Sequence, residues 1–215
     1  MQTVTVEEAV AMIPDGATVM IGGFMAVGTP ERLMDEMVRQ RKRDLTLIAN
    51  DTGRPGRGIG KLVSARLLRK AVATHIALNP ETQAQKMAGE LEVELAPLGM
   101  LVERIRAAGF GLGGILTRDG LGTEAEAGKE QIEVAGETYL VETPLRADFA
   151  LVQAFAADLD GNLAYALTAR NFNPMIARAA DTVIVCADNI VPAGAIAPDH
   201  VVTPGPLVDY LVAKG

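Results

Sequence analysis

Hydrophobic positions along this chain fall alternately into short apolar runs and longer segments with helical spacing. Between Pro30 and Arg41, four apolar side chains recur at the spacing of one helix face, and the opposite face is charged. Strands that alternate with helices predict an α/β fold, in which an open, mostly parallel sheet carries helices on both faces. Five short, nearly continuous apolar runs are typical of its buried strands: Thr18–Ile21, Leu45–Ala49, Ala71–Thr74, Phe149–Phe155 and Thr182–Cys186.

Capping residues mark where several helices should begin. A Ser, Thr, Asp or Asn side chain can accept a hydrogen bond from the first helical turn, and proline is favoured at the first helical position. Four such starts are predicted: Thr5-Val-Glu-Glu8, Thr29-Pro30, Asn79-Pro80 and Asn173-Pro174. We expect the first of these helices to reach about Met12 and the last to reach about Ala180.

One segment interrupts the alternation of strands and helices. The stretch from Gly109 to Gly128 is rich in glycine, and it is followed by two strand-like runs, Gln131–Val134 and Thr138–Glu142, around a short turn. This pattern predicts a β-hairpin insertion. Since the chain has neither an internal repeat nor a long linker, we expect residues 1–215 to form a single domain.

Composition narrows the possible functions. Apolar residues make up 49% of the chain and aromatic residues only 4%, so the core should be aliphatic, and the net charge of −7 argues against a general nucleic-acid binder. The lone Cys186 excludes an internal disulfide and is better explained as a buried strand residue than as a nucleophile. With only His75 and His200, a histidine metal site is not expected. Neither a signal peptide nor a membrane span is apparent, which favours the cytoplasm.

Two loops are candidates for ligand binding. Gly22 and Gly23 follow an apolar run and allow a sharp turn, which could bring backbone N–H groups close to phosphate or carbonyl oxygens. Their spacing is not that of a dinucleotide-binding fingerprint, and a turn that only packs is the alternative. The loop from Asn50 to Gly60 carries Arg54 and Arg57, with Lys61 just beyond. It is either an anion clamp or a solvated, mobile loop.

A larger ordered set of motifs resembles the alpha subunit of the family I CoA transferases, above all the acetate/acetoacetate type and then the 3-oxoacid (succinyl and 3-oxoadipate) type. The motifs cover nearly the whole chain: Asp15-Gly16-x-x-(three apolar)-Gly22-Gly23-Phe24-x-x-x-Gly28-x-Pro30, Leu45-Thr-Leu-Ile-Ala-Asn-Asp51, Asn79-Pro-Glu-Thr82, Gly89-Glu-Leu-Glu-Val-Glu-Leu95, Leu101-x-Glu-Arg-Ile-Arg106, Pro144-Leu-Arg-Ala-Asp148, Ala169-Arg-Asn-Phe-Asn173 and Val202-Thr-Pro-Gly205.

The resemblance implies an enzyme that moves CoA from a short-chain acyl-CoA to a free carboxylic acid. It implies a partner beta subunit, usually in an α2β2 heterotetramer, and a glutamyl-CoA thioester as intermediate. The family's nucleophilic glutamate lies in the beta subunit, in a Ser-Glu-Asn-Gly context that this chain lacks. We therefore expect no catalytic nucleophile, metal or permanently bound cofactor in this chain, with CoA and acyl-CoA as substrates. A non-catalytic ligand-binding α/β domain is the alternative.

The resemblance also assigns candidate site residues. The segment assigned to CoA corresponds here to Gly22, Gly23, Phe24, Met25, Ala26, Val27 and Gly28. The family's Pro-Gln-Gly turn, whose glutamine donates to the developing oxyanion, is here Pro97-Leu98-Gly99, and leucine cannot donate a hydrogen bond. Three explanations remain open: a substitute donor such as a backbone N–H near Gly99, a more apolar acyl group that contacts Leu98 and Met100, or reduced activity.

Overall fold

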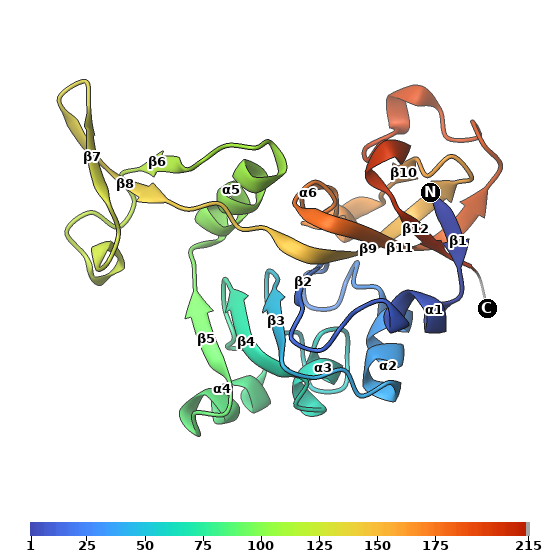
Figure 1. Ribbon diagram of the computed structural model, residues 1–215, viewed down its shortest axis with the longest axis horizontal. Helices are drawn as coiled ribbons and strands as arrows, with labels where there is room; N and C mark the ends of the chain where they lie inside the picture. Colours follow the sequence, from blue (N-terminus) through green and yellow to red (C-terminus); the bar gives the residue numbers. More distant parts are fainter. Residues whose placement is uncertain (214–215) are drawn as a thin grey trace.

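A nine-stranded, largely parallel sheet forms the body of the computed structural model, which describes residues 1–213 (Figure 1). Its order is β1-β12-β11-β9-β2-β3-β4-β5, and β10 pairs antiparallel with β9. The strands are β1 (Gln2–Val4), β2 (Thr18–Ile21), β3 (Leu45–Ile48), β4 (Leu68–Ala73), β5 (Glu92–Leu95), β9 (Ala147–Asp158), β10 (Leu163–Ala164), β11 (Ala180–Val191) and β12 (Tyr210–Val212).

Helices cover both faces of this sheet, as predicted. Successive residues of β2 alternate between two hydrophobic clusters: Val19 and Ile21 belong to the one that includes α1, α2 and α3, and Met20 to the one that includes α5 and α6. This alternation follows from the two-residue period of a strand. The helices are α1 (Val6–Ala11), α2 (Glu31–Arg39), α3 (Gly60–Ser64), α4 (Pro80–Met87), α5 (Leu98–Gly109) and α6 (Asn173–Ile176), with short 3₁₀ helices at η1 (Glu124–Glu126), η2 (Leu167–Arg170), η3 (Pro198–His200) and η4 (Gly205–Leu207).

Two of the four predicted helix caps are confirmed. Thr5 and Glu8 form a reciprocal capping box, with the Glu8 backbone N–H 3.2 Å from Thr5 Oγ1 and the Thr5 N–H 2.8 Å from Glu8 Oε2. Asn79 Oδ1 accepts from the backbone N–H groups of Glu81 and Thr82 at 3.1 and 3.3 Å. Both caps depend on residues within one turn, which is why the local pattern identifies them.

The other two caps are wrong. Pro30, not Thr29, is the N-cap of α2, and the buried Thr29 hydroxyl has no hydrogen-bond partner among residues 1–213. Asn173 is itself the first residue of α6, behind Phe172, and α6 ends at Ile176 well short of Ala180. Pro97 is the N-cap of α5, so Leu98 and Gly99 of the expected turn are the first two residues of that helix.

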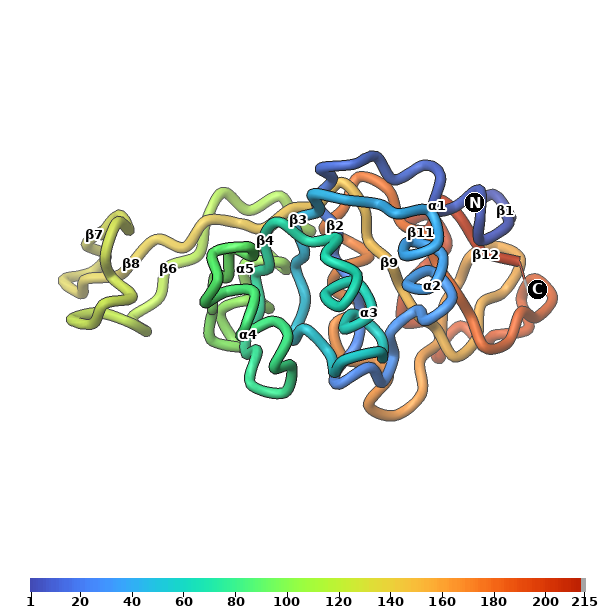
Figure 2. The backbone as a smooth tube through the Cα atoms, turned by 90° about the horizontal axis from the view of Figure 1, so that it is seen from below, coloured from blue at the N-terminus to red at the C-terminus, as the bar shows by residue number. Residues whose placement is uncertain are grey.

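The predicted hairpin insertion is confirmed and is part of a three-stranded arm. Strands β7 (Gln131–Val134) and β8 (Glu137–Glu142) form the hairpin, and β6 (Ile115–Thr117) adds to the other edge of β8. The arm extends away from the body beyond β5 and α5 in both views (Figures 1 and 2). The sequence did not indicate β6, which lies within the glycine-rich stretch.

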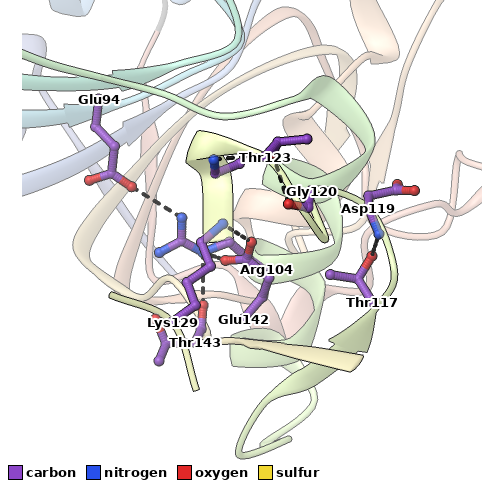
Figure 3. A network of polar contacts seen from close by, with 10 residues as sticks. Glu94, Arg104, Thr117, Asp119, Gly120, Thr123, Lys129, Glu142 and Thr143 are labelled. Atoms are coloured by element: carbon purple, nitrogen blue, oxygen red, sulfur yellow. Dashed lines mark hydrogen bonds and ion pairs between the residues drawn. The ribbon is translucent and has the colours of Figure 1, made fainter. Parts of the chain in front are cut away.

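A network of ionic contacts fixes the base of the arm to the body (Figure 3). Arg104 of α5 reaches Glu94 Oε1 at 3.1 Å and donates from Nε to the Thr143 carbonyl oxygen at 2.8 Å. Lys129 Nζ lies 2.5 Å from Glu142 Oε1, and the Glu142 side chain is nearly buried. Burial opposes ionisation of Glu94, but hydrogen bonds from Arg104 and Lys70 outweigh it and lower the pKa of Glu94. Arg104 therefore links the body of the protein to Thr143, at the base of the arm.

Candidate functional site

The candidate site lies where the connections of the sheet change direction. The chain runs from β2 to β3, which lies on one side of β2 in the sheet. The neighbour of β2 on its other side is β9, and from β9 the chain continues to β11, away from β2. Open α/β sheets bind ligands in the crevice at the carboxyl ends of strands at such a switch point. The predicted glycine loop, residues 22–28, directly follows β2 and therefore opens into this crevice.

The glycine loop is a tight hairpin turn at its tip. Phe24 and Val27 exchange backbone hydrogen bonds of 3.0 and 2.9 Å. Between them, Met25 and Ala26 have φ angles of 51° and 73°, the left-handed pattern of type I′ turns. Such conformations cost about 1–3 kcal/mol each in non-glycine residues and persist only where the surroundings impose them. The tip is therefore held in a strained conformation by its neighbours.

Two asparagines supply much of that restraint: Asn171 directly follows η2, and Asn173 is the first residue of α6. Asn171 Oδ1 accepts from the Gly23 N–H at 2.9 Å, and Asn171 Nδ2 donates to the Val27 carbonyl oxygen at 3.0 Å. Asn173 Nδ2 donates to the Gly28 carbonyl oxygen at 2.9 Å. A Cβ atom on Gly22 would lie 1.9 Å from Asn173 Oδ1, so only glycine fits at that position. In the sequence these asparagines stand out only as part of a motif, and the prediction of Asn173 as a cap misses this role.

Asp51 restrains the other side of the loop. Asp51 is 3% exposed, and its carboxylate accepts from the Met25 N–H at 3.0 Å, the Asn50 amide at 2.8 Å and the Gly53 N–H at 2.7 Å. It therefore connects the glycine loop to the loop that carries the arginines. Sequence reasoning missed this role; the available signal was an Asn-Asp pair directly after a buried strand, at the sheet edge where sites form.

An apolar cavity of about 540 Å³ opens beside the glycine loop. Phe24 and Leu98 stand in its wall and are 43% and 52% exposed, and Arg170 adds a guanidinium group. Because Leu98 is the first residue of α5, the first N–H groups of that helix lie at the same end and have no intrahelical acceptor. The remaining lining residues are Asn50, Val102, Leu167, Thr168, Asn171, Phe172 and Met175.

A second cavity, of about 370 Å³, adjoins the first. It is lined by three residues of the glycine loop, by both loop arginines and by Thr168: Phe24, Met25, Val27, Arg54, Arg57 and Thr168. Phe24 and Thr168 border both cavities. The two cavities therefore form one candidate site, which is apolar beside Leu98 and positively charged beside Arg54 and Arg57.

The structure places the other candidates differently. Ala26 packs against Gly58, where an added Cβ would come within 2.9 Å of the Ala26 Cβ. Gly99 and Met100 are not among the described residues that line either cavity, so the expected contact of an acyl group with Met100 is not supported. Cys186 is buried in β11 as predicted, and burial raises the pKa of its thiol to about 12.

A larger hollow, of about 860 Å³, lies at the opposite, amino ends of the strands. Asp15 and Arg43 in its wall pair with each other at 2.8 Å, and this pairing lowers the pKa of Asp15. None of the glycine-loop residues or the two asparagines lines this hollow, so the candidate site remains the crevice at the carboxyl ends of the strands. Within residues 1–213, no helix is long and apolar enough to cross a membrane.

Comparisons with known proteins agree on one family. The family model described as "Coenzyme A transferase" matches residues 3–214. The alpha subunit of acetate CoA-transferase from Escherichia coli K12 is 49% identical over 98% of this chain and 96% of its own length. The alpha subunit of acetoacetyl-CoA:acetate/butyrate CoA transferase from Clostridium acetobutylicum is 49% identical over 93% and 92%. A 3-oxoadipate CoA-transferase subunit from Pseudomonas putida is 41% identical over 97% and 91%.

Solved structures show the same fold. An acyl-CoA transferase from E. coli O157:H7, YdiF, in a thioester complex with CoA, superposes with a TM-score of 0.86 at 22% identity, over 99% of this chain and 47% of the larger one. A variant of the decarboxylase AibA/AibB superposes with a TM-score of 0.84 at 30% identity, over 99% and 82%.

Proposed function

This chain belongs to the coenzyme A transferase family as an alpha subunit, and from that premise we propose that it builds the CoA-ester side of an active site whose attacking carboxylate comes from a beta subunit. The reaction moves CoA from an acyl-CoA to a free carboxylic acid through a glutamyl-CoA thioester on that partner. We further propose that residues 1–215 act as a single domain in a cytoplasmic α2β2 assembly.

One observation carries this proposal: a strained, tightly held glycine loop and an apolar cavity meet at Phe24. A loop fixed by Asn171 and Asp51 can present Phe24 and backbone groups to a CoA ester without reordering on binding, which favours affinity. The apolar cavity beside it offers room for a short acyl group. The names of the two relatives at 49% identity suggest acetyl, acetoacetyl or butyryl groups, and the 3-oxoadipate relative, at 41%, is the less similar alternative.

The chain's chemical contribution is electrostatic. When a carboxylate attacks a thioester, negative charge develops on the carbonyl oxygen, and donors aimed at that oxygen lower the barrier. Leu98 cannot donate, but the N–H groups of the first turn of α5 lie at the end of the helix that meets the cavity. We propose that an N–H near Gly99 takes part of this charge and that Leu98 favours apolar acyl groups.

Reconstitution tests the function. The chain is co-expressed with a CoA-transferase beta subunit from the same genome, and CoA exchange is measured with several short-chain acyl-CoA and acid pairs. We expect the complex to exchange CoA and the chain alone to be inactive. Full activity of the isolated chain, sugar-phosphate binding without any CoA exchange, or release of CO₂ instead of CoA transfer by the complex would contradict the proposal.

The substitution Leu98→Gln tests the oxyanion position. If residue 98 faces the carbonyl oxygen, glutamine restores a donor there, and the gain in kcat on acetate or acetoacetate approaches the factor of about 10² associated with one such donor. Leu98→Met, which keeps an apolar side chain of similar volume, is the matched control and should give no gain. An unchanged kcat for Leu98→Gln would place residue 98 away from the reacting carbonyl.

A further inference from the structure

The loop between β3 and α3 presents two arginines side by side. Arg54 and Arg57 face each other across a two-residue hairpin, with the Arg57 N–H 3.1 Å from the Arg54 carbonyl oxygen. Residues directly opposite in such a hairpin project from the same face with Cβ atoms about 5 Å apart, and like charges at that spacing repel. An anion bound between the two guanidinium groups would offset this repulsion.

Neither arginine is neutralised by the protein within residues 1–213. Both are exposed, and no carboxylate of the described chain forms an ion pair with either. Their neighbour Lys61 differs, because Glu31 Oε2 and Asp35 Oδ1 each lie 2.6 Å from its Nζ. The nearby Asp51 carboxylate points inward to backbone N–H groups. Two uncompensated positive charges thus lie together on a protein whose net charge is −7.

The hairpin is held firmly at its base. Asp51 Oδ1 binds the Gly53 N–H at 2.7 Å, and the Gly60 N–H donates to the Arg57 carbonyl oxygen at 3.0 Å. The base is closed so tightly that a Cβ on Gly60 would lie 1.8 Å from the Arg54 carbonyl oxygen. Backbone positions fixed in this way reduce the entropy lost when the arginines bind a ligand. This rigid base argues against the alternative of a mobile loop.

Its location identifies the ligand class. Arg54 and Arg57 border the cavity that they share with Phe24, and Phe24 also borders the apolar cavity beside Leu98. A ligand with an apolar acyl group at one end and phosphates at the other matches this arrangement of an apolar cavity next to a positively charged one. We infer that Arg54 and Arg57 form a phosphate clamp that binds the phosphate groups of an acyl-CoA while its acyl end occupies the apolar cavity. This inference rests on the proposed transferase function.

The test compares ligands with and without phosphates. The double variant Arg54→Gln/Arg57→Gln in complex with its beta partner should show a KM for acetoacetyl-CoA raised about tenfold, with kcat within twofold, because charge-assisted hydrogen bonds to phosphate are lost. Its KM for acetoacetyl-pantetheine, which has no phosphate, should be unchanged. Acetoacetyl-dephospho-CoA, which lacks the 3′-phosphate, shows which phosphate the arginines bind. If the double variant raises its KM less than it raises the KM for acetoacetyl-CoA, the clamp binds the 3′-phosphate, and if both KM values rise equally, it binds the diphosphate.

Arg41→Gln/Arg69→Gln is the matched control, since it also removes two exposed arginines. Arg41 precedes β3 and Arg69 lies at the start of β4, so both are at the amino ends of the strands, away from the crevice. It should leave every KM unchanged. Calorimetric titration of the same complexes with CoA and with pantetheine gives a readout independent of turnover. Equal affinity of the wild-type complex for CoA and pantetheine, or an unchanged CoA affinity in the double variant, would overturn the clamp. If the complex shows no CoA transfer but the double variant binds CoA more weakly than wild type, only the proposed transferase function is overturned.

Discussion

Replacing Gly22 by alanine should lower kcat/KM for CoA transfer by at least about 100-fold. The new Cβ would lie 1.9 Å from Oδ1 and 2.4 Å from Cγ of Asn173. Asn173 is fully buried and holds Gly28, Ala169 and the Gln153 N–H through its amide, so it cannot move aside without breaking these hydrogen bonds. The glycine loop must shift instead, and a displacement of about 1 Å near reacting groups can reduce a rate 10²-fold.

Steady-state kinetics of the assembled complex, together with the melting temperature of each variant, measure this effect. Gly113→Ala is the matched control, because an added Cβ at Gly113 meets open space beside the arm. It should retain the wild-type rate. If Gly22→Ala keeps its activity within threefold while remaining folded, close packing of the loop against Asn173 is not required for the reaction.

The second large effect is expected from Asp51→Asn. The two carboxylate oxygens accept from Met25, Asn50 and Gly53, and an amide replaces one acceptor by a donor that faces another donor. Because the group is buried, the unfolding free energy should fall by about 2–3 kcal/mol, which lowers the melting temperature by about 5–10 °C. The KM for acyl-CoA should rise severalfold, since the strained turn at Met25 loses one of its restraints.

Thermal unfolding of the full chain and the KM of the complex test this prediction. Asp199→Asn, which makes the same chemical change at an exposed position, should leave both quantities unchanged. A melting temperature within 1 °C of wild type for Asp51→Asn would mean that the carboxylate does not restrain the two loops.

The features that sequence reasoning predicted are those set by nearby residues. The buried strands, the capping box at Thr5 and the cap at Asn79 each depend on periodicity or on contacts within one helical turn. The residues alone identified the glycine loop as either a packing turn or a ligand site. The resemblance favoured a ligand site and added Leu98, and both assignments stay predictions. The hairpin was predicted because both of its strands are consecutive in sequence.

The features that were missed depend on distant partners. Asn173 has a good capping side chain, but its amide is used by Gly28, 145 residues away, so the local pattern gave the wrong assignment. Strand β6 has three residues and exists only because β8 pairs with it. Asp51 contacts Met25 across 26 residues, and nothing in the local sequence indicated which backbone groups its carboxylate would bind.

The same fold occurs in a protein whose name is that of a decarboxylase, AibA/AibB, which superposes over 99% of this chain. We propose that the two subunits divide the reaction between them: this chain binds and orients the CoA ester, and the partner supplies the nucleophile. The most direct measurement is the intact mass of each subunit of the complex after brief incubation with acyl-CoA, followed by mapping of the modified peptide. We predict a CoA thioester on a glutamate of the partner and none on this chain. A CoA thioester on any carboxylate of this chain, above all when it is incubated alone, would contradict the account.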